Sequence, residues 1–201
     1  MKNSLLAIIA AASGFLLFSG CMGTFETARV VPFKLGATYF ATIDASEDDS
    51  FTMPGMILET GWPAAPARFG LGLHLRATAV IGSDQNDDNG FMIVWGGKLQ
   101  IPQNSLIDIA LGLDIWGYVP GEIKLYLSRR FGIIEPYVIL AVAELIDFRD
   151  SDILNADGLT SYTLGTMIEL GSGSGWALAA EFEGGDVWVS QGVGLGLIRE
   201  F

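Results

Sequence analysis

The sequence predicts an all-β protein, an antiparallel up-and-down β-barrel of about ten strands, on three observations. Large apolar residues alternate with small or polar ones along many segments, which is the two-residue period of a strand. Turn signals separate these segments at roughly 8 to 12 residues, the spacing of barrels and sandwiches. After the N-terminus no run of ~18 apolar residues occurs, so helical membrane spans are not expected.

Residues 1–20 are expected to be an export signal, because Lys2 precedes an apolar run that ends in small residues. Cys21 follows at once and is the only cysteine in the sequence. The stretch LLFSGC resembles a bacterial lipoprotein signal, with Phe18 where Leu is usual, and the resemblance implies that Cys21 is acylated. The alternative is ordinary secretory cleavage. Residues 21–201 are then expected to form one barrel domain, since the length gives no reason for two.

Ten strand segments follow Cys21, and many reach the ~9 to 11 residues that cross a membrane as a tilted strand. Eight or twelve strands are the alternatives, because two of the connections can be assigned differently. The expected strands are 30–43, 52–62, 68–80, 90–101, 105–118, 122–131, 136–147, 160–170, 175–183 and 189–201.

The connections alternate in character along the chain. Those at 44–50, 82–90 and 147–158 are long and acidic, whereas VPG at 119–121 and GGDVWV at 184–189 complete the same series. The intervening connections, at 63–67, 102–104, 132–135 and 171–175, are short and nearly uncharged. Alternate connections of an up-and-down barrel lie at the same end, so we expect a long-loop end and a short-turn end. Ten strands would put both chain ends at the short-turn end.

The two faces of the strands differ in size and charge. In residues 105–118, for example, Leu111 and Leu113 share an apolar face, while Gly112 and Asp114 share the other. Small residues suit the interior of a narrow barrel, and a charge that faces lipid costs ~2 to 4 kcal/mol at the bilayer midplane. We therefore expect a transmembrane barrel with the apolar face outward; the alternative is a soluble barrel with that face inward. The charges expected in the lumen are Arg68, His74, Arg76, Lys98, Asp108, Asp114, Lys124, Arg130, Glu169, Glu181 and Glu183.

Aromatic residues gather next to the connections, as the interfacial girdles of membrane proteins require. Trp95, in the middle of a strand, does not fit this arrangement. The residues expected in the girdles are Trp62, Tyr137, Trp176 and Phe201 at the short-turn end and Trp116, Tyr162 and Trp188 at the other.

With an export signal, amphipathic strands, asymmetric connections and a terminal LGLIREF, the chain resembles bacterial outer-membrane β-barrel proteins. The resemblance covers residues 30–201 in general pattern and carries no subfamily motif. It implies an outer membrane of the Gram-negative type, surrounding lipid, and a C-terminal Phe201 that is part of the signal for the barrel assembly machinery. A lipoprotein signal before a barrel departs from the usual pattern.

The function expected is that of a structural or surface-interaction barrel, with a narrow passage for small solutes as a variant of it. One alternative is a periplasmic lipoprotein with a soluble lipid- or ligand-binding barrel. The other is a small barrel hydrolase that uses His74 with Asp108 or Asp114.

Few partners are predicted from the sequence besides lipid and the assembly machinery. The net charge of −12 argues against nucleic acid, and no cofactor is expected. His74 is the only histidine, so a metal site with two histidines is excluded. Asp84, Asn86 and Asp88 are a weak calcium candidate, and divalent cations are expected at the acidic loops.

Overall fold

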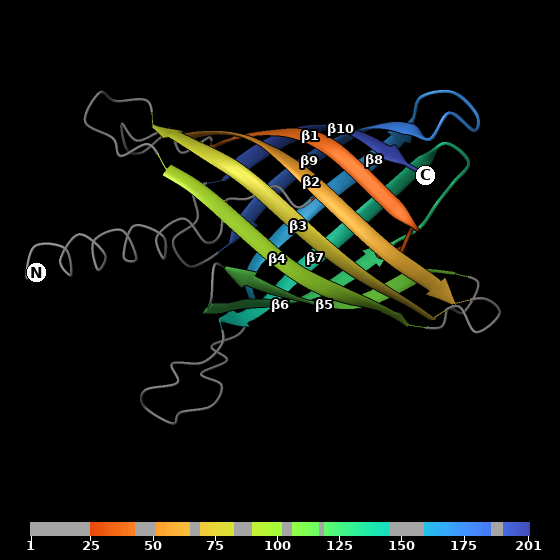
Figure 1. The fold of residues 1–201 in the computed structure, drawn as a ribbon, viewed down its shortest axis with the longest axis horizontal. Helices are drawn as coiled ribbons and strands as arrows, with labels where there is room; N and C mark the ends of the chain where they lie inside the picture. Colours follow the sequence, from red (N-terminus) through yellow and green to blue (C-terminus); the bar gives the residue numbers. More distant parts are fainter. Residues whose placement is uncertain are drawn as a thin grey trace, which may run out of the picture.

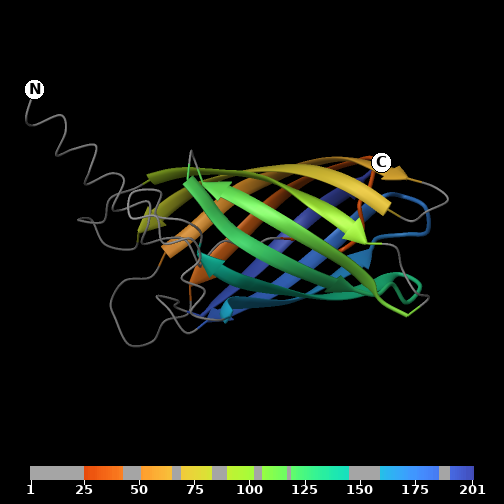
Figure 2. The same cartoon turned by 90° about the horizontal axis from the view of Figure 1, so that it is seen from below.

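The computed structural model describes residues 25–42, 51–64, 69–82, 90–101, 106–116, 119–144, 159–185 and 191–201. These residues form a closed antiparallel barrel of ten strands that cross it obliquely (Figures 1 and 2). The strands are β1 (Phe33–Thr42), β2 (Phe51–Ala64), β3 (Phe69–Gly82), β4 (Gly90–Ile101), β5 (Asp108–Trp116), β6 (Val119–Ser128), β7 (Ile134–Glu144), β8 (Leu159–Glu169), β9 (Trp176–Gly185) and β10 (Gly192–Glu200).

Each strand pairs with its neighbours in sequence, and β1 closes the barrel against β10 in a register that runs from Lys34 opposite Glu200 to Thr42 opposite Gly192. The predicted all-β, up-and-down fold of ten strands is therefore confirmed. No helix within the described ranges is long and apolar enough to cross a membrane.

Many strand boundaries differ from the prediction by one to three residues, and three of these differences bear on the chain's path. Residues 30–32, expected at the start of the first strand, precede β1 and do not pair as a strand. The segment 119–121, expected to be a connection, belongs to β6. Ile134 and Glu135, expected in a turn, open β7. In the last two cases the local turn signal is overridden by pairing with the neighbouring strand.

The apolar face of the strands lies on the outside of the barrel, as expected. Leu73, Leu111 and Leu195 are 46%, 47% and 65% exposed, whereas Asp114 and Lys98 on the opposite face are 0% and 1% exposed. A side-chain period of two lets each strand present most of its large apolar residues on one side, although some, such as Ile57 and Ile198, face the interior.

Two of the connections at the short-turn end, residues 129–133 and 170–175, are described. Gly175 has a φ of 71°, and a Cβ atom there would lie 2.4 Å from the carbonyl oxygen of Glu200. Only glycine combines this left-handed conformation with so close an approach of the backbone. The turn therefore holds β9 tightly beside the end of β10.

Candidate functional site

Residues 25–32, called the inner segment below, run through the barrel lumen before the chain enters β1. Phe25, Glu26, Thr27 and Ala28 are each no more than 1% exposed, although none belongs to a strand. The segment extends from beside the middle of β10 to the short-turn end, where the amide of Gly61 donates to the carbonyl of Pro32 (3.1 Å). The described chain therefore reaches β1 from within the lumen. β1 begins and β10 ends at the short-turn end, as expected of ten strands, but the segment before β1 runs inside the barrel.

Glycines of the inner face make room for the segment. A Cβ atom at Gly61 would lie 2.4 Å from Val30 Cγ1, and one at Gly196 would lie 3.0 Å from Phe25 Cδ1. A closed barrel of eight strands is just filled by its own side chains, so ten strands with glycine on the inner face leave space for one more strand of chain. The glycine-rich face is thus matched to a segment of the same protein.

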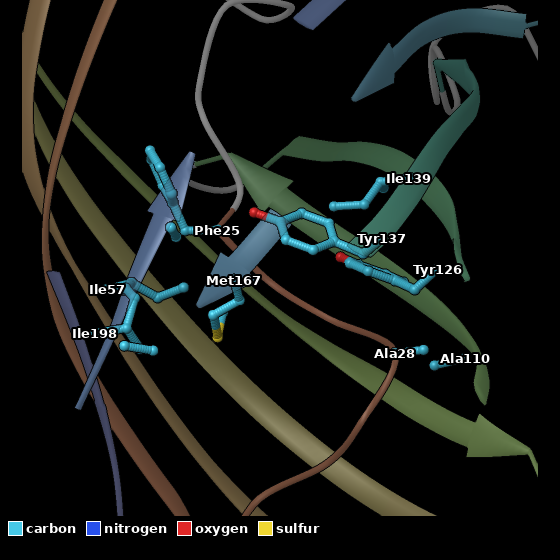
Figure 3. Packing of buried hydrophobic residues seen from close by; sticks show 11 residues of the cluster. Phe25, Ala28, Ile57, Ala110, Tyr126, Tyr137, Ile139, Met167 and Ile198 are labelled. Atoms are coloured by element: carbon cyan, nitrogen blue, oxygen red, sulfur yellow. The ribbon is translucent and has the colours of Figure 1, made fainter. Parts of the chain in front are cut away.

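Apolar side chains from the wall complete the packing around the segment (Figure 3). Phe25 packs with Ile57 and Ile198 on one side of the lumen, and the rings of Tyr126 and Tyr137 lie on the other. The lumen therefore has a small apolar core of its own as well as charges.

Side chains of the wall satisfy the backbone of the inner segment. The amide of Phe25 donates to Glu181, that of Ala28 to Ser128 Oγ (3.3 Å) and that of Val30 to Gln100 Oε1 (2.9 Å). Buried amides outside a sheet need such partners, because an unpaired one costs about 1–3 kcal/mol. The wall is thus built to hold an irregular segment in place.

One buried charge cluster joins β1, β2 and β4. Glu59 lies between Lys34 Nζ (3.0 Å) and Lys98 Nζ (2.8 Å), and all three side chains are 0% exposed. Lys98 Nζ also donates to the carbonyl of Thr27 (2.9 Å), which ties the cluster to the inner segment.

A second cluster centres on Asp114 of β5. Its carboxylate contacts Arg76, Lys124 Nζ (2.8 Å) and His74 Nε2 (2.8 Å). His74 Nδ1 lies 3.4 Å from Glu26 Oε1 of the inner segment. Each nitrogen of the imidazole ring therefore faces a carboxylate. The hydrolase hypothesis needs one of them to face a nucleophilic hydroxyl, and the described residues place none there.

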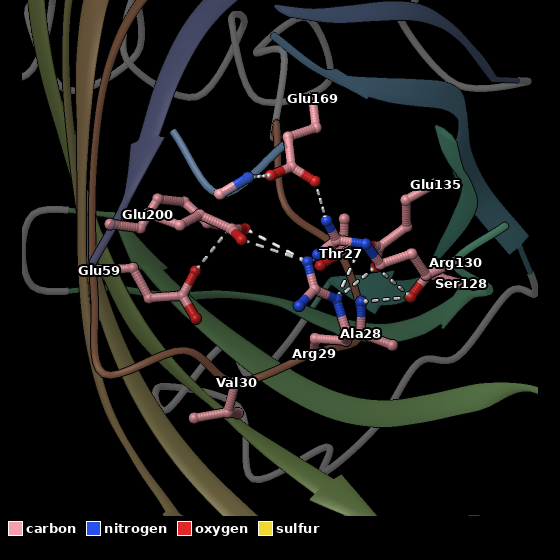
Figure 4. Close-up of polar contacts among 12 residues, drawn as sticks. Thr27, Ala28, Arg29, Val30, Glu59, Ser128, Arg130, Glu135, Glu169 and Glu200 are labelled. Atoms are coloured by element: carbon pink, nitrogen blue, oxygen red, sulfur yellow. Dashed lines mark hydrogen bonds and ion pairs between the residues drawn. The ribbon is translucent and has the colours of Figure 1, made fainter. Parts of the chain in front are cut away.

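The third cluster lies at the mouth of the barrel at the short-turn end (Figure 4). The Arg29 guanidinium bridges Glu135 (2.7 Å) and Glu200 (3.2 Å), and Ser128 donates to Glu135 (3.0 Å). An open cavity of about 220 Å³ lies beside this bridge. The described charged groups that line it are already paired with one another, so this part of the chain offers a ligand no unpaired charge there.

Most of the predicted lumen charges are buried on the inner face, and the rest lie at or near the mouth or outside the described residues. Arg130 and Glu169 contact each other at the rim of the mouth, where the Arg130 side chain is 39% exposed. Asp108 is half-buried near the same end, and Arg68 lies outside the described residues. The remainder are buried on the inner face: His74, Arg76, Lys98, Asp114, Lys124, Glu181 and Glu183.

Some of the predicted girdle residues lie on the outer face, one is buried in the lumen, and two have side chains that the structure does not describe. Trp62, Trp176 and Phe201 are exposed on the outer face at the short-turn end, and Tyr162 is half-buried beside Phe182. Tyr137 was wrongly assigned: it is 3% exposed, and its hydroxyl donates to Glu181 (2.7 Å). Tyr137 occupies an inward-facing position of β7, and a large aromatic side chain there cannot be told from an outward one by its type alone. Trp116 lies in β5, but its side chain, like the whole of Trp188, is outside the description.

Several lumen residues were not identified from the sequence. Lys34, Glu59, Glu122 and Glu135 follow the alternation and could have been found from it. Glu26 and Arg29 of the inner segment carry no such signal, because the segment has no period of its own.

The predicted lipidation site Cys21 and the calcium candidate Asp84, Asn86 and Asp88 fall outside the described residues. Within the described residues, no group of three or more His, Cys, Asp or Glu side chains could hold a metal ion. Comparison of the chain with models of known protein families gives no match. A comparison with curated proteins gives no match either.

Proposed function

We propose that the protein is an integral β-barrel of a bacterial outer membrane, with a structural or surface-interaction role and a lumen closed by its own chain. The observation that carries this proposal is the distribution of side chains between the two faces. All ten strands contribute exposed large apolar residues, whereas buried ion pairs lie in the interior.

A surface of this kind does not suit water. Soluble monomers rarely expose contiguous apolar patches larger than a few hundred Å², and here the apolar face continues around the closed barrel. A soluble ligand-binding barrel would place its large apolar side chains inside, around the ligand. Hydrocarbon is the surrounding in which this outer face is stable without further partners.

The contents of the lumen favour a structural role over a wide passage. The inner segment fills the half of the lumen nearest the short-turn end, and it is bound by hydrogen bonds from several strands. Wide aqueous channels need ~16 strands, six more than this barrel has. The variant with an open solute passage is therefore not favoured.

Membrane insertion can be tested without the acyl chain. The chain from residue 22 onward would be exported behind an ordinary signal peptide, and its membranes would be washed with alkaline carbonate. An embedded barrel stays in the membrane pellet and changes its mobility on a denaturing gel when it is heated. A soluble barrel that was only tethered through Cys21 is released into the wash, and that result would refute the proposal.

Closure of the lumen has its own test in planar lipid bilayers. We expect the complete chain to give no large, steady conductance, because residues 25–32 occupy the lumen. A stable open current from the unmodified protein would contradict closure but would leave the membrane location standing.

A further inference from the structure

Two of the basic side chains that the structure describes differ from the others because they have no carboxylate partner among the described residues. Six of the described lysines and arginines pair with carboxylates: Arg29, Lys34, Arg76, Lys98, Lys124 and Arg130. Arg129 and Arg199 make no ion pair with any described residue. Both lie on the outer face, at the short-turn end of the barrel.

Aromatic rings hold both guanidinium groups. The Arg199 Cζ atom lies 4.5 Å from the ring centroid of Phe201 and 5.2 Å from that of Trp176. Arg129 Cζ lies 4.9 Å from the ring centroid of Phe131. Stacking on a ring fixes the orientation of a guanidinium and leaves its N–H donors free for an anion.

Among the described residues, no carboxylate of the outer face competes for these donors. The acidic side chains that the structure describes lie in the lumen or at its mouth, for example Glu181 and Glu200. The described strand ends that flank the long acidic connections of the sequence, 44–50, 82–90 and 147–158, lie at the opposite end of the barrel. The outer face at the short-turn end is therefore cationic.

We propose that Arg129 and Arg199 each bind the phosphate group of a phospholipid in the leaflet at the short-turn end. This inference rests on the proposed membrane function and specifies phospholipid as the class of lipid that binds to the outer face. A guanidinium matches the geometry of a phosphate with two parallel N–H···O bonds. Exposed aromatic rings such as those of Phe131 and Phe201 place this level of the barrel at the boundary between hydrocarbon and headgroups.

A lipid fits these sites better than a free anion in solution. Each guanidinium is flanked by exposed apolar surface, including Trp176 at 37% and Phe201 at 57% exposure, on which an acyl chain can lie. Inorganic phosphate would gain the charge contact alone.

Native mass spectrometry of the detergent-purified, full-length protein tests the proposal, with phosphatidylglycerol as the probe. We expect Arg129→Gln and Arg199→Gln each to weaken one binding event by about fivefold, the effect of one basic residue near an anionic lipid surface. The double variant should weaken both events, each by about the same factor. Arg130→Gln is the matched control, because Arg130 is next in sequence but turns to Glu169 at the mouth.

Three results would overturn the inference: equal phosphatidylglycerol binding by the double variant, equal binding of a diacylglycerol that lacks phosphate, or displacement of the lipid by inorganic phosphate at equal concentration. Heat-dependent gel mobility of each variant shows that the barrel is folded. If the protein dissolves without detergent and holds no lipid, the proposed function itself fails; if it is embedded but binds lipid independently of the arginines, only this inference fails.

Discussion

At the scale of single residues, the interior shows how a barrel accommodates buried charge. Glu59 compensates two lysines at once, and neither it nor they touch solvent. Burial of an ion costs several kcal/mol, which the attraction to its partners offsets only when the geometry is close. Each such residue is therefore more important for stability than an exposed residue of the same type.

Glu59→Gln should show this difference directly. The amide keeps the shape of the side chain but leaves the charges of Lys34 and Lys98 uncompensated, so we expect the free energy of unfolding to fall by about 3–5 kcal/mol. Arg130→Gln, which breaks the partly exposed pair with Glu169, should cost about 0–1 kcal/mol. Urea unfolding of both variants in detergent micelles measures the two values; similar losses would mean that the Glu59 cluster is hydrated.

At the scale of elements, the inner segment depends on the wall for its conformation. It has no ladder of its own, and its amides are satisfied by Glu181, Ser128 and Gln100 from three different strands. Loss of the space that it occupies should therefore release the segment without breaking the sheet.

Gly61→Val is the change that removes this space. A Cβ atom at Gly61 would lie 2.7 Å from the carbonyl oxygen of Val31, so a larger side chain cannot share the site with the segment. We expect trypsin to cut after Arg29 much faster in this variant while the barrel stays heat-modifiable. Gly90→Val is the control, because a Cβ atom there meets only Val80, at 3.9 Å. Equal cleavage of both variants and of the wild type would contradict the assigned contact.

The strands and the inner segment also differ in how far the sequence predicts them. Alternation indicated all ten strands and placed Asp114 and Lys98 inside, because a period of two is imposed by the backbone itself. It did not separate the large inward ring of Tyr137 from an outward aromatic, since alternation gives the face only through the size and polarity of its neighbours. The inner segment escaped prediction because its burial comes from a lumen that exists only after β1 has closed on β10.

At the scale of the whole molecule, the outer face is the feature on which the proposed membrane location depends. The leucines of β3, β5 and β10 are exposed because no other described segment covers them, and the half of the interior nearest the short-turn end is already filled. Stability in this arrangement depends on the solvent, so the same charged substitution on the outer face should be costly in lipid and tolerated in water.

Leu111→Lys tests this dependence at the middle of the barrel wall. Leu111 lies near the centre of β5 and is 47% exposed, so in a bilayer the lysine would stand at the midplane and cost about 2–4 kcal/mol. Leu106, 59% exposed in the turn before β5, lies at the rim, where Leu106→Lys should cost only about 0–1 kcal/mol. Refolding into phospholipid vesicles, followed by urea titration, gives both values. A soluble barrel would tolerate the two lysines equally, because both side chains would extend into water. A loss confined to Leu111→Lys therefore distinguishes a hydrocarbon surrounding from an aqueous one.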